Sequence, residues 1–584
     1  MSNYFLDNSD IQFHLRNMDL ARVVRLKEDD FAERGEYPFA PRDHDDAVDN
    51  YRRVLEIVGD ISGEFVAPRA REVDRQGASF ADGEVTYAKG TQEALDRLAK
   101  ADLMGFTLPR KYGGINLPKT LYSMATELIS RADASLMNLF GLQEIADTIA
   151  KFGTEEQKQK YLPKFCTGET SGAMALTEPD AGSDLQSITL RADLDQDGRW
   201  KLNGVKRFIT NGCADVSLVM ARSEPRISGG RGISLFIYER DEHMKVRRIE
   251  KKLGIHGSPT CELQFNNAPA ELLGKRKMGL VKYTMSLMNG ARLGVAAQAV
   301  GIAEAAYRDA FSYARERTQF KKPILDFAAV YEMLTDMRVS IEAGRSLLYE
   351  TSRVVDIKEG LEEKVEGHPE LKDDLKDDLK RYSRWASLLT PLVKGYTSEM
   401  ANRVCYDAIQ VHGGTGYTTD FNAERYYRDA RITNIYEGTT QLQVVAAIGG
   451  IMTGAALEIL NEYEDRHDFA PVQELFARAQ TFRAWLEEAI AHVKTKNDPA
   501  FQEYHARRIV DMTAETIMSY LVCMDGLHSP RKQDVARTFI ALARPRLRSM
   551  HEAVLSDEVT CMTTHASILH GSEEFQEQEE ASEA

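Results

Sequence analysis

The spacing of apolar residues predicts helices over the first part of the chain. In residues 1–170 apolar positions recur every three or four residues, as at Leu121, Met124 and Leu128, which is the period of an amphipathic helix. Thr154 is followed three residues later by Gln157, a capping box that predicts a helix start. We find no strand-like run in this part, so we predict an N-terminal helical domain over residues 1–170.

The pattern changes to short strands between residues 171 and 285. The runs Ser217–Met220 and Ile233–Ile237 are rich in β-branched and large apolar residues and are bounded by turn-forming residues, which predicts strands. Asn203–Gly204 stands between two strand-like runs, and this dipeptide is the strongest short-range signal for a hairpin turn. We therefore predict a middle β domain over residues 171–285.

The helical period returns after residue 286. One apolar stripe contains Leu293, Ala296, Ala297, Val300, Tyr307, Ala310, Phe311 and Ala314, so we predict a C-terminal domain of the four-helix type over residues 286–455. Residues 356–381 interrupt it with ten acidic and six basic residues. We interpret this insertion as a solvated helical extension, and a docking arm for a partner is the alternative.

A further helical segment is predicted over residues 456–570. An apolar stripe continues through Leu475, Phe476, Phe482, Leu486, Ile490 and Val493, and both Asp498 and Ser529 precede a proline, as a cap residue precedes a first-turn proline. Residues 571–584 form an acid-rich tail that we expect to be disordered. The predicted fold is mainly α, with a β domain inserted between two helical bundles and an appended helical bundle.

Composition and charge narrow the function. The chain of 584 residues has a formal net charge of −16, which argues against a nucleic-acid binder, because such proteins neutralise phosphates with basic residues. We find neither an apolar run long enough to span a membrane nor a secretory signal. The six cysteines are scattered without a C-x-x-C pair, so we expect reduced thiols, no metal site and a cytoplasmic location. Nucleotide-binding and zinc-protease motifs are also missing from the sequence.

Candidate chemistry lies in separated segments that each have an ordinary structural explanation, such as a turn, a loop or a helix end. They are Met174–Ser183, Lys206–Asn211, Lys252–Glu262, Arg315–Phe320, Gln410–Tyr417 and Ile435–Gln441. Together, in this order and across a helical–β–helical frame, they resemble the acyl-CoA dehydrogenase family over about residues 85–450. The charged insertion and the appended bundle resemble the longer branch that includes 3-methylthiopropionyl-CoA dehydrogenases.

The resemblance implies α,β-dehydrogenation of an acyl-CoA thioester to the trans-2-enoyl-CoA, as in fatty acid β-oxidation. Glu437 matches the base that removes the α-proton, and its own backbone N–H matches a donor to the thioester carbonyl. A buried carboxylate with a raised pKa is suited to this role. Some branches place the base at the position of Ala291, which cannot accept a proton.

FAD is the cofactor that the resemblance implies, because a saturated carbon gives up hydride only to such an acceptor. Thr210 matches a hydroxyl near flavin N5, and Phe208 stands where many relatives carry Trp. The matching FAD contacts are Met174, Leu176, Thr177, Gly182, Ser183, Phe208, Thr210, Arg317, Phe320, Gln410, Gly413, Gly414, Thr439 and Gln441. The matching substrate contacts are Ser183, Asn289, Arg292, Tyr436 and Gly438.

Partners also follow from the resemblance. Arg317, Phe320, Gln410 and Gly413–Gly414 match residues that reach the FAD of a neighbouring subunit, so we expect a homo-oligomer, at least a dimer. We expect electrons to pass to an electron-transfer flavoprotein. An acyl-CoA oxidase and a non-catalytic flavin-binding scaffold are the alternatives. For the acyl group we favour short or medium straight chains over 3-methylthiopropionyl.

Overall fold

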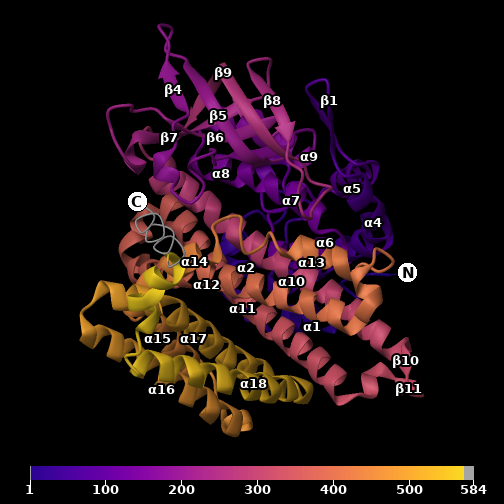
Figure 1. Cartoon of the computed structure of the whole chain (residues 1–584). Coiled ribbons are helices and arrows are strands. Elements are labelled where there is room, and N and C mark those ends of the chain that lie inside the picture. The colour runs from indigo at the N-terminus through magenta and orange to yellow at the C-terminus, as the bar shows by residue number, and fades with distance from the viewer. Residues whose placement is uncertain (1, 571–584) are drawn as a thin grey trace, which may run out of the picture. The chain divides into compact units, whose positions relative to one another are not determined.

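The computed structural model describes residues 2–570, and the chain forms two compact units, Met1–Gln443 and Val444–Ala584. The predicted acidic tail at 571–584 lies outside the described residues. In the first unit, helices are followed by a β-sheet and then by long helices, and Figure 1 shows the strands β4–β9 gathered on one side of this unit. This order confirms the predicted fold class.

The first helices precede the sheet. Thr154 and Gln157 cap α9 reciprocally, so the predicted capping box is confirmed. The π-helical turn Ile61–Val66 joins α3 to α4. The bounds are α1 (Ser9–Asn17), α2 (Ala21–Lys27), α3 (His44–Asp60), α4 (Ala67–Gln76), α5 (Lys89–Lys100), α6 (Lys119–Ala132), α7 (Ala134–Gly141), α8 (Ile145–Phe152) and α9 (Glu155–Thr167).

The expectation that this part contains no strands was wrong. A short hairpin pairs β1 (Ser79–Ala81) with β2 (Glu84–Thr86). Asp82 and Gly83 form its turn with φ of +54° and +85°, the left-handed conformation that an Asp-Gly turn favours. The Asp-Gly dipeptide was the signal in the sequence, but three-residue strands are too short to give an alternating pattern.

The β domain contains a seven-stranded sheet within the described residues. The strands run in the order β3-β6-β4-β5-β9-β7, β8 pairs with β9, and β7 also pairs with β6, so the pairings close into a ring. Closure leaves few free strand edges. The bounds are β3 (Gly172–Ala175), β4 (Arg191–Leu194), β5 (Trp200–Thr210), β6 (Val216–Arg222), β7 (Ile233–Glu239), β8 (Met244–Ile249) and β9 (Thr260–Leu273).

The hairpin predicted at Asn203–Gly204 was wrong. Both residues lie inside β5, where the register with β9 shifts between Leu202 and Gly204. Gly204 has a φ of +142°, and a Cβ there would lie 3.0 Å from the Cα of Leu190. The glycine therefore permits a bulge and a close backbone approach. The turn of the hairpin lies earlier, between β4 and β5, with Gly198 at a φ of +77°.

Long helices follow the sheet. They are α10 (Met285–Glu316), α11 (Ala328–Gly367), α12 (Lys372–His412), α13 (Ala423–Ala430) and α14 (Thr440–Met452), with the two-residue strands β10 (Thr318–Gln319) and β11 (Lys322–Pro323) after α10. The charged segment 356–381 is the end of α11 and the start of α12, so it is helical as expected. It is not solvated throughout, because Asp356, Ile357 and Leu361 are buried.

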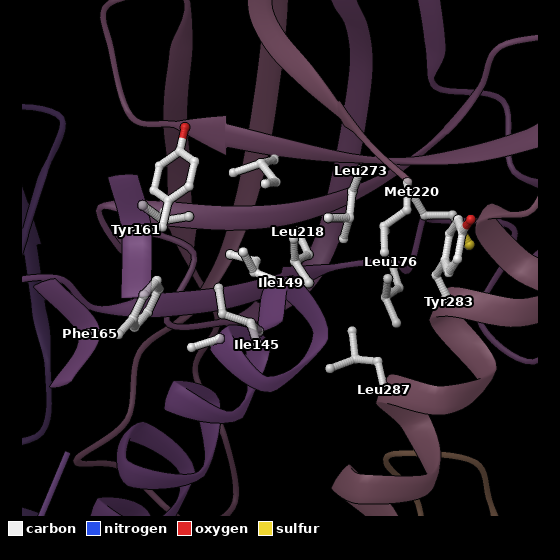
Figure 2. Close-up of a cluster of buried hydrophobic side chains, with 14 of the residues drawn as sticks. Ile145, Ile149, Tyr161, Phe165, Leu176, Leu218, Met220, Leu273, Tyr283 and Leu287 are labelled. Atoms are coloured by element: carbon white, nitrogen blue, oxygen red, sulfur yellow. The ribbon is translucent and has the colours of Figure 1, made fainter. Parts of the chain in front are cut away.

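A buried apolar cluster joins the β domain to the helices around it. Figure 2 shows Ile149 of α8 beside Leu218 of β6, with Ile145 of α8 and Phe165 of α9 in the same cluster. Leu287, near the start of α10, belongs to the same cluster. Because one core is shared by sheet and helices, their facing surfaces are held in fixed relative positions.

The second unit contains α15 (Ala455–Arg466), α16 (Gln473–Lys496), α17 (Pro499–Gly526) and α18 (Pro530–Leu555). The predicted stripe of α16 is buried, apart from the partly exposed Phe476. Asp498 caps α17 with its side chain, whereas Ser529 makes no side-chain cap on α18. Among the described residues, no single helix is long and apolar enough to cross a membrane. The helices α14 and α15 reach that length and hydropathy only when they are taken together, and the chain bends by 66° between them.

Candidate active site

A cavity of about 640 Å³ lies between the β domain and the helices of the first unit. Its lining comes from the end of α7, the loop after β3, the end of β5, the first turns of α10 and the segment between α13 and α14. Most of the lining is apolar, which suits a cofactor or a small-molecule ligand. Glu437 lines this cavity together with Tyr436, Gly438 and Thr439.

Glu437 stands on a tight left-handed turn. Its φ is +52° and that of Gly438 is +87°. The side-chain amide of Gln443 donates to the carbonyl oxygens of Glu437 at 3.2 Å and Gly438 at 2.9 Å, which holds the turn in place. A non-glycine residue in this conformation is strained, and such strain is concentrated at functional sites.

The surroundings of Glu437 set the affinity of its carboxyl group for a proton. Burial raises the pKa of Glu437 above the ordinary value, and the positive charges of Lys394 and Arg292 oppose this rise. The Lys394 ammonium donates to the Gly438 carbonyl at 2.6 Å, and burial lowers the pKa of Lys394 to about 8. Raised pKa values of this kind are typical of carboxylates that exchange protons near neutrality.

Arg292 lies on α10, one residue after the cavity-lining Ala291. It donates to the Asn289 side chain at 3.1 Å, so these two predicted substrate contacts lie together. Its buried Nε has no hydrogen-bond partner among the described residues. A buried donor without a partner is unfavourable, but neither Arg292 nor Asn289 is among the residues that line the cavity.

A buried polar network that sequence reasoning missed supports Tyr436. The Tyr436 hydroxyl donates to the side-chain oxygen of Gln298 on α10, and the Gln298 amide donates to the side-chain oxygen of Asn138 on α7 at 3.0 Å. Asn138 in turn donates to the Ser258 hydroxyl at 3.2 Å. The network therefore connects two helices, the β domain and the turn that carries Glu437. The signal in the sequence was a polar residue, Gln298, inside the apolar face of α10.

Six of the predicted cofactor contacts do not line the cavity. Figure 1 places the hairpin of β10 and β11, which holds Phe320, at the far end of α10 from the sheet. Stacking of Tyr313 on His412, at 4.6 Å between ring centroids, brings the end of α10 beside the end of α12. The Phe320 side chain is 88% exposed. The six exposed residues are Arg317, Phe320, Gln410, Gly413, Gly414 and Gln441.

Comparisons with known proteins decide the family. The sequence matches the models of the N-terminal, middle and C-terminal domains of acyl-CoA dehydrogenases over residues 49–169, 173–268 and 281–448. A further model, described as "Acyl-CoA dehydrogenase C terminal", matches residues 452–556. The 3-methylmercaptopropionyl-CoA dehydrogenase of Ruegeria pomeroyi is 35% identical over 432 residues, which cover 69% of this chain and 70% of that protein. The chain belongs to the acyl-CoA dehydrogenase family.

This acyl-CoA dehydrogenase is accordingly an oxidoreductase and a flavoprotein that uses FAD. An acyl-CoA dehydrogenase of Bacillus anthracis, solved in complex with FAD, is 25% identical with a TM-score of 0.72, and the match covers 86% of this chain and 88% of that one. A chain solved in work on the electron transferring flavoprotein of Acidaminococcus fermentans is 36% identical with a TM-score of 0.58, over 68% and 96% of the two chains.

The β-domain side of the cavity in this acyl-CoA dehydrogenase fits a flavin. Phe208 has a φ of +60° and presents a ring that is 51% exposed, which makes a flat apolar wall. The hydroxyls of Thr177, Ser183 and Thr210 also line the cavity, and none of them bonds to another described residue. Space remains at Gly182, where an added Cβ would meet only Thr177, at 3.9 Å.

The sequence identified part of the lining and missed the rest. Met174 and Leu176, which were predicted as FAD contacts, line the cavity, and Lys252 and Thr260 of the glycine-rich run line it too. The missed residues lie mainly on helices, where spacing indicates burial but not which neighbour a side chain meets. They include Met137, Gly141, Leu142, Glu144, Leu185, Met288, Gly294, Val295, Ile432 and Leu442.

Proposed function

We propose that this enzyme removes hydrogen from the α and β carbons of an acyl-CoA thioester, with Glu437 as the base. The observation that carries the proposal is the position of Glu437. Its carboxyl group is partly buried, has a raised pKa, and lines a cavity that Phe208, Thr177 and Thr210 also line. A base and a flavin-binding wall that border one apolar space fit the removal of a proton and a hydride from adjacent carbons.

Each step is assigned to residues of this chain. The Glu437 carboxylate takes the α-proton, and its raised pKa makes it a stronger base than an exposed glutamate. The backbone N–H of Glu437 is a donor that suits a thioester oxygen as it gains negative charge. When bound, FAD supplies the acceptor for the β-hydride. The apolar lining excludes water from the reacting carbons.

We further propose that electrons leave to an electron-transfer flavoprotein and that the active unit is at least a dimer. The Acidaminococcus fermentans chain that this protein resembles comes from work on such a flavoprotein. The exposed group around Arg317 and Phe320 lies away from the cavity of its own chain, which favours contact with the cofactor of a second subunit. The acyl group is a short or medium chain; 3-methylthiopropionyl, the substrate named for the Ruegeria pomeroyi relative, is the competing candidate.

An anaerobic titration with acyl-CoAs tests the reaction. The flavin absorbance of the wild-type enzyme should fall with at least one thioester, and Glu437→Gln should slow this reduction by about 10² or more, because the amide cannot take a proton. Glu363→Gln, the same change at an exposed site, should behave as wild type.

The identity of the electron acceptor is tested on the same enzyme preparations. Turnover should require an electron-transfer flavoprotein and should release little peroxide under air. Peroxide in amounts equal to the enoyl product would instead identify an oxidase, and flavin that no acyl-CoA reduces would identify a non-catalytic scaffold. Rapid reduction of the Glu437→Gln flavin would exclude Glu437 as the base.

A further inference from the structure

One carboxylate lines the helical side of the cavity and has no part in the reaction proposed above. Glu144 lies at the end of the short helical turn Leu142–Glu144, between α7 and α8. Its side chain is 11% exposed, and the exposed part borders the cavity. An acidic group is unexpected here, because an alkyl chain gains nothing from a charged wall and the charge loses hydration.

Glu144 is held in place by a buried lysine. The Lys119 ammonium at the start of α6 donates to Glu144 Oε1 at 2.7 Å and also to Asp147. Burial raises the pKa of Glu144, while the Lys119 charge acts in the opposite direction. Because Lys119 is shared between two carboxylates, this group of three side chains keeps a net negative charge while Glu144 is ionised.

The second oxygen of Glu144 remains available. No hydrogen bond from a described residue reaches Oε2, in contrast to Oε1. Gly290 and Gly294 of α10 stand opposite, and a Cβ on either would lie 3.8 to 4.0 Å from Oε2. Without side chains at these two positions, α10 leaves the carboxylate uncovered.

We propose that Glu144 selects acyl chains that carry a hydroxyl group beyond the reacting carbons, by accepting a hydrogen bond from that hydroxyl through Oε2. A hydroxyl suits the site better than an ammonium, because the cavity is largely apolar and Lys119 already supplies a positive charge beside Oε1. The inference rests on the proposed function, since it names the substrate class of the same cavity.

Matched ligands separate this role from a purely structural ion pair. ω-Hydroxyacyl-CoAs of four, five and six carbons are each compared with the unsubstituted acyl-CoA one carbon longer, in which a methyl group replaces the hydroxyl. Binding is measured by anaerobic calorimetry on the FAD-loaded Glu437→Gln enzyme without an electron acceptor, in which the reaction is slowed by about 10² or more. At one or more lengths the hydroxyl compound should bind at least about tenfold more tightly, as expected for a hydrogen bond to a charged group.

Variants of Glu144 then assign the preference. In the Glu437→Gln enzyme, the additional change Glu144→Leu should reverse the preference for the hydroxyl ligand, because the cavity wall becomes apolar. Lys119 keeps Asp147 as its partner in this variant. Glu144→Gln, which retains an oxygen acceptor, should keep part of the preference. A methyl preference at every length, or a ratio that Glu144→Leu leaves unchanged, would overturn the inference.

Flavin reduction keeps the two proposals apart. If unsubstituted acyl-CoAs reduce the wild-type flavin and Glu144 has no effect on selection, only the present inference fails. If no acyl-CoA binds or reduces the flavin, the proposed function fails and the inference fails with it.

Discussion

The chemistry of the site depends on a few charged residues around Glu437. Burial and the left-handed turn come from the fold, whereas the opposing positive charges come from Lys394 on α12 and Arg292 on α10. The pKa of Glu437 is therefore a balance between desolvation and two cations. Such a balance is adjustable by a single substitution.

The pH dependence of turnover reports this balance. As the proposed base, Glu437 must be ionised to accept a proton, so kcat/KM should rise as the pH passes through its pKa. Lys394, with a pKa of about 8, is positively charged below that pH and lowers the pKa of Glu437. Lys394→Gln keeps a donor for the Gly438 carbonyl but removes the charge, so the rising limb should move to higher pH by about one unit.

The control is Lys372→Gln, which removes a charge from an exposed site on the same helix and should leave the profile in place. A limb that stays fixed in Lys394→Gln, or moves to lower pH, would contradict the electrostatic assignment.

The sequence could indicate some residues of the site and not others, for a physical reason. Glu437 and Gly438 lie in one short segment, Ile435–Gln441. Residues that are neighbours along the chain remain neighbours in the fold, so the sequence can indicate them together. Glu144 lines the cavity, and Lys394 and Gln298 contact the lining residues Gly438 and Tyr436, only because α12, α10 and the turn before α8 pack together. Periodicity predicts that a helix face is buried, but it does not state which residues of other helices that face meets.

At the scale of elements, a buried layer of charge connects four helices. Arg345 of α11 contacts Glu127 of α6 at 2.6 Å and Glu304 of α10 at 2.8 Å, and it also pairs with Asp10 of α1. The three carboxylates are almost fully buried. One guanidinium therefore compensates charges from three directions, and its removal would take away the cation that the three carboxylates share, although Glu304 would keep Arg308 and Arg338.

Arg345→Met tests this layer. The substitution keeps an apolar stem and removes the cation, so the free energy of unfolding should fall by about 3–5 kcal/mol. Chemical denaturation followed by circular dichroism measures the change. Arg53→Met, which breaks an exposed pair with Asp49, should change stability by less than about 1 kcal/mol. Equal losses in both variants would contradict the structural role of the buried layer.

The elements that were predicted wrongly are those for which the local sequence carries too little information. Asn203–Gly204 has the composition of a hairpin turn, but in the fold Gly204 admits a bulge where β5 passes close to Leu190. Local sequence permits both conformations, and pairing with β9 selects one. The long helices were predictable because their apolar period extends over many turns, while the three-residue strands β1 and β2 offered too few positions.

At the scale of the whole molecule, large aromatic residues are exposed near the ends of α10 and α12. Phe320 is 88% exposed and Tyr417 is 87% exposed. Exposed aromatic side chains of this size are common at protein–protein interfaces. The same region holds Arg317, Gln410 and the glycines 413 and 414, which is consistent with a second subunit and its cofactor as the partner.

Arg317→Ala tests this assignment. A guanidinium that contacts a diphosphate makes strong charge-assisted hydrogen bonds, so its loss should yield protein with depleted FAD and a weaker dimer. Flavin content comes from the visible spectrum and mass from light scattering at several concentrations. Arg315→Ala, at an exposed arginine two residues earlier, serves as the control. Full flavin content together with unchanged mass would show that the interface lies elsewhere.

Ala291 and Glu437 border the same cavity from α10 and from the turn before α14. A carboxylate at residue 291 would extend from a helix, whose preceding turn limits the rotamers of a side chain, whereas the present carboxylate extends from a turn held by Gln443. The architecture thus offers two independent points of attachment for a proton acceptor. Moving the carboxylate from residue 437 to residue 291 would change the direction from which it approaches the substrate and how firmly it is held. The fold itself would not have to change for this.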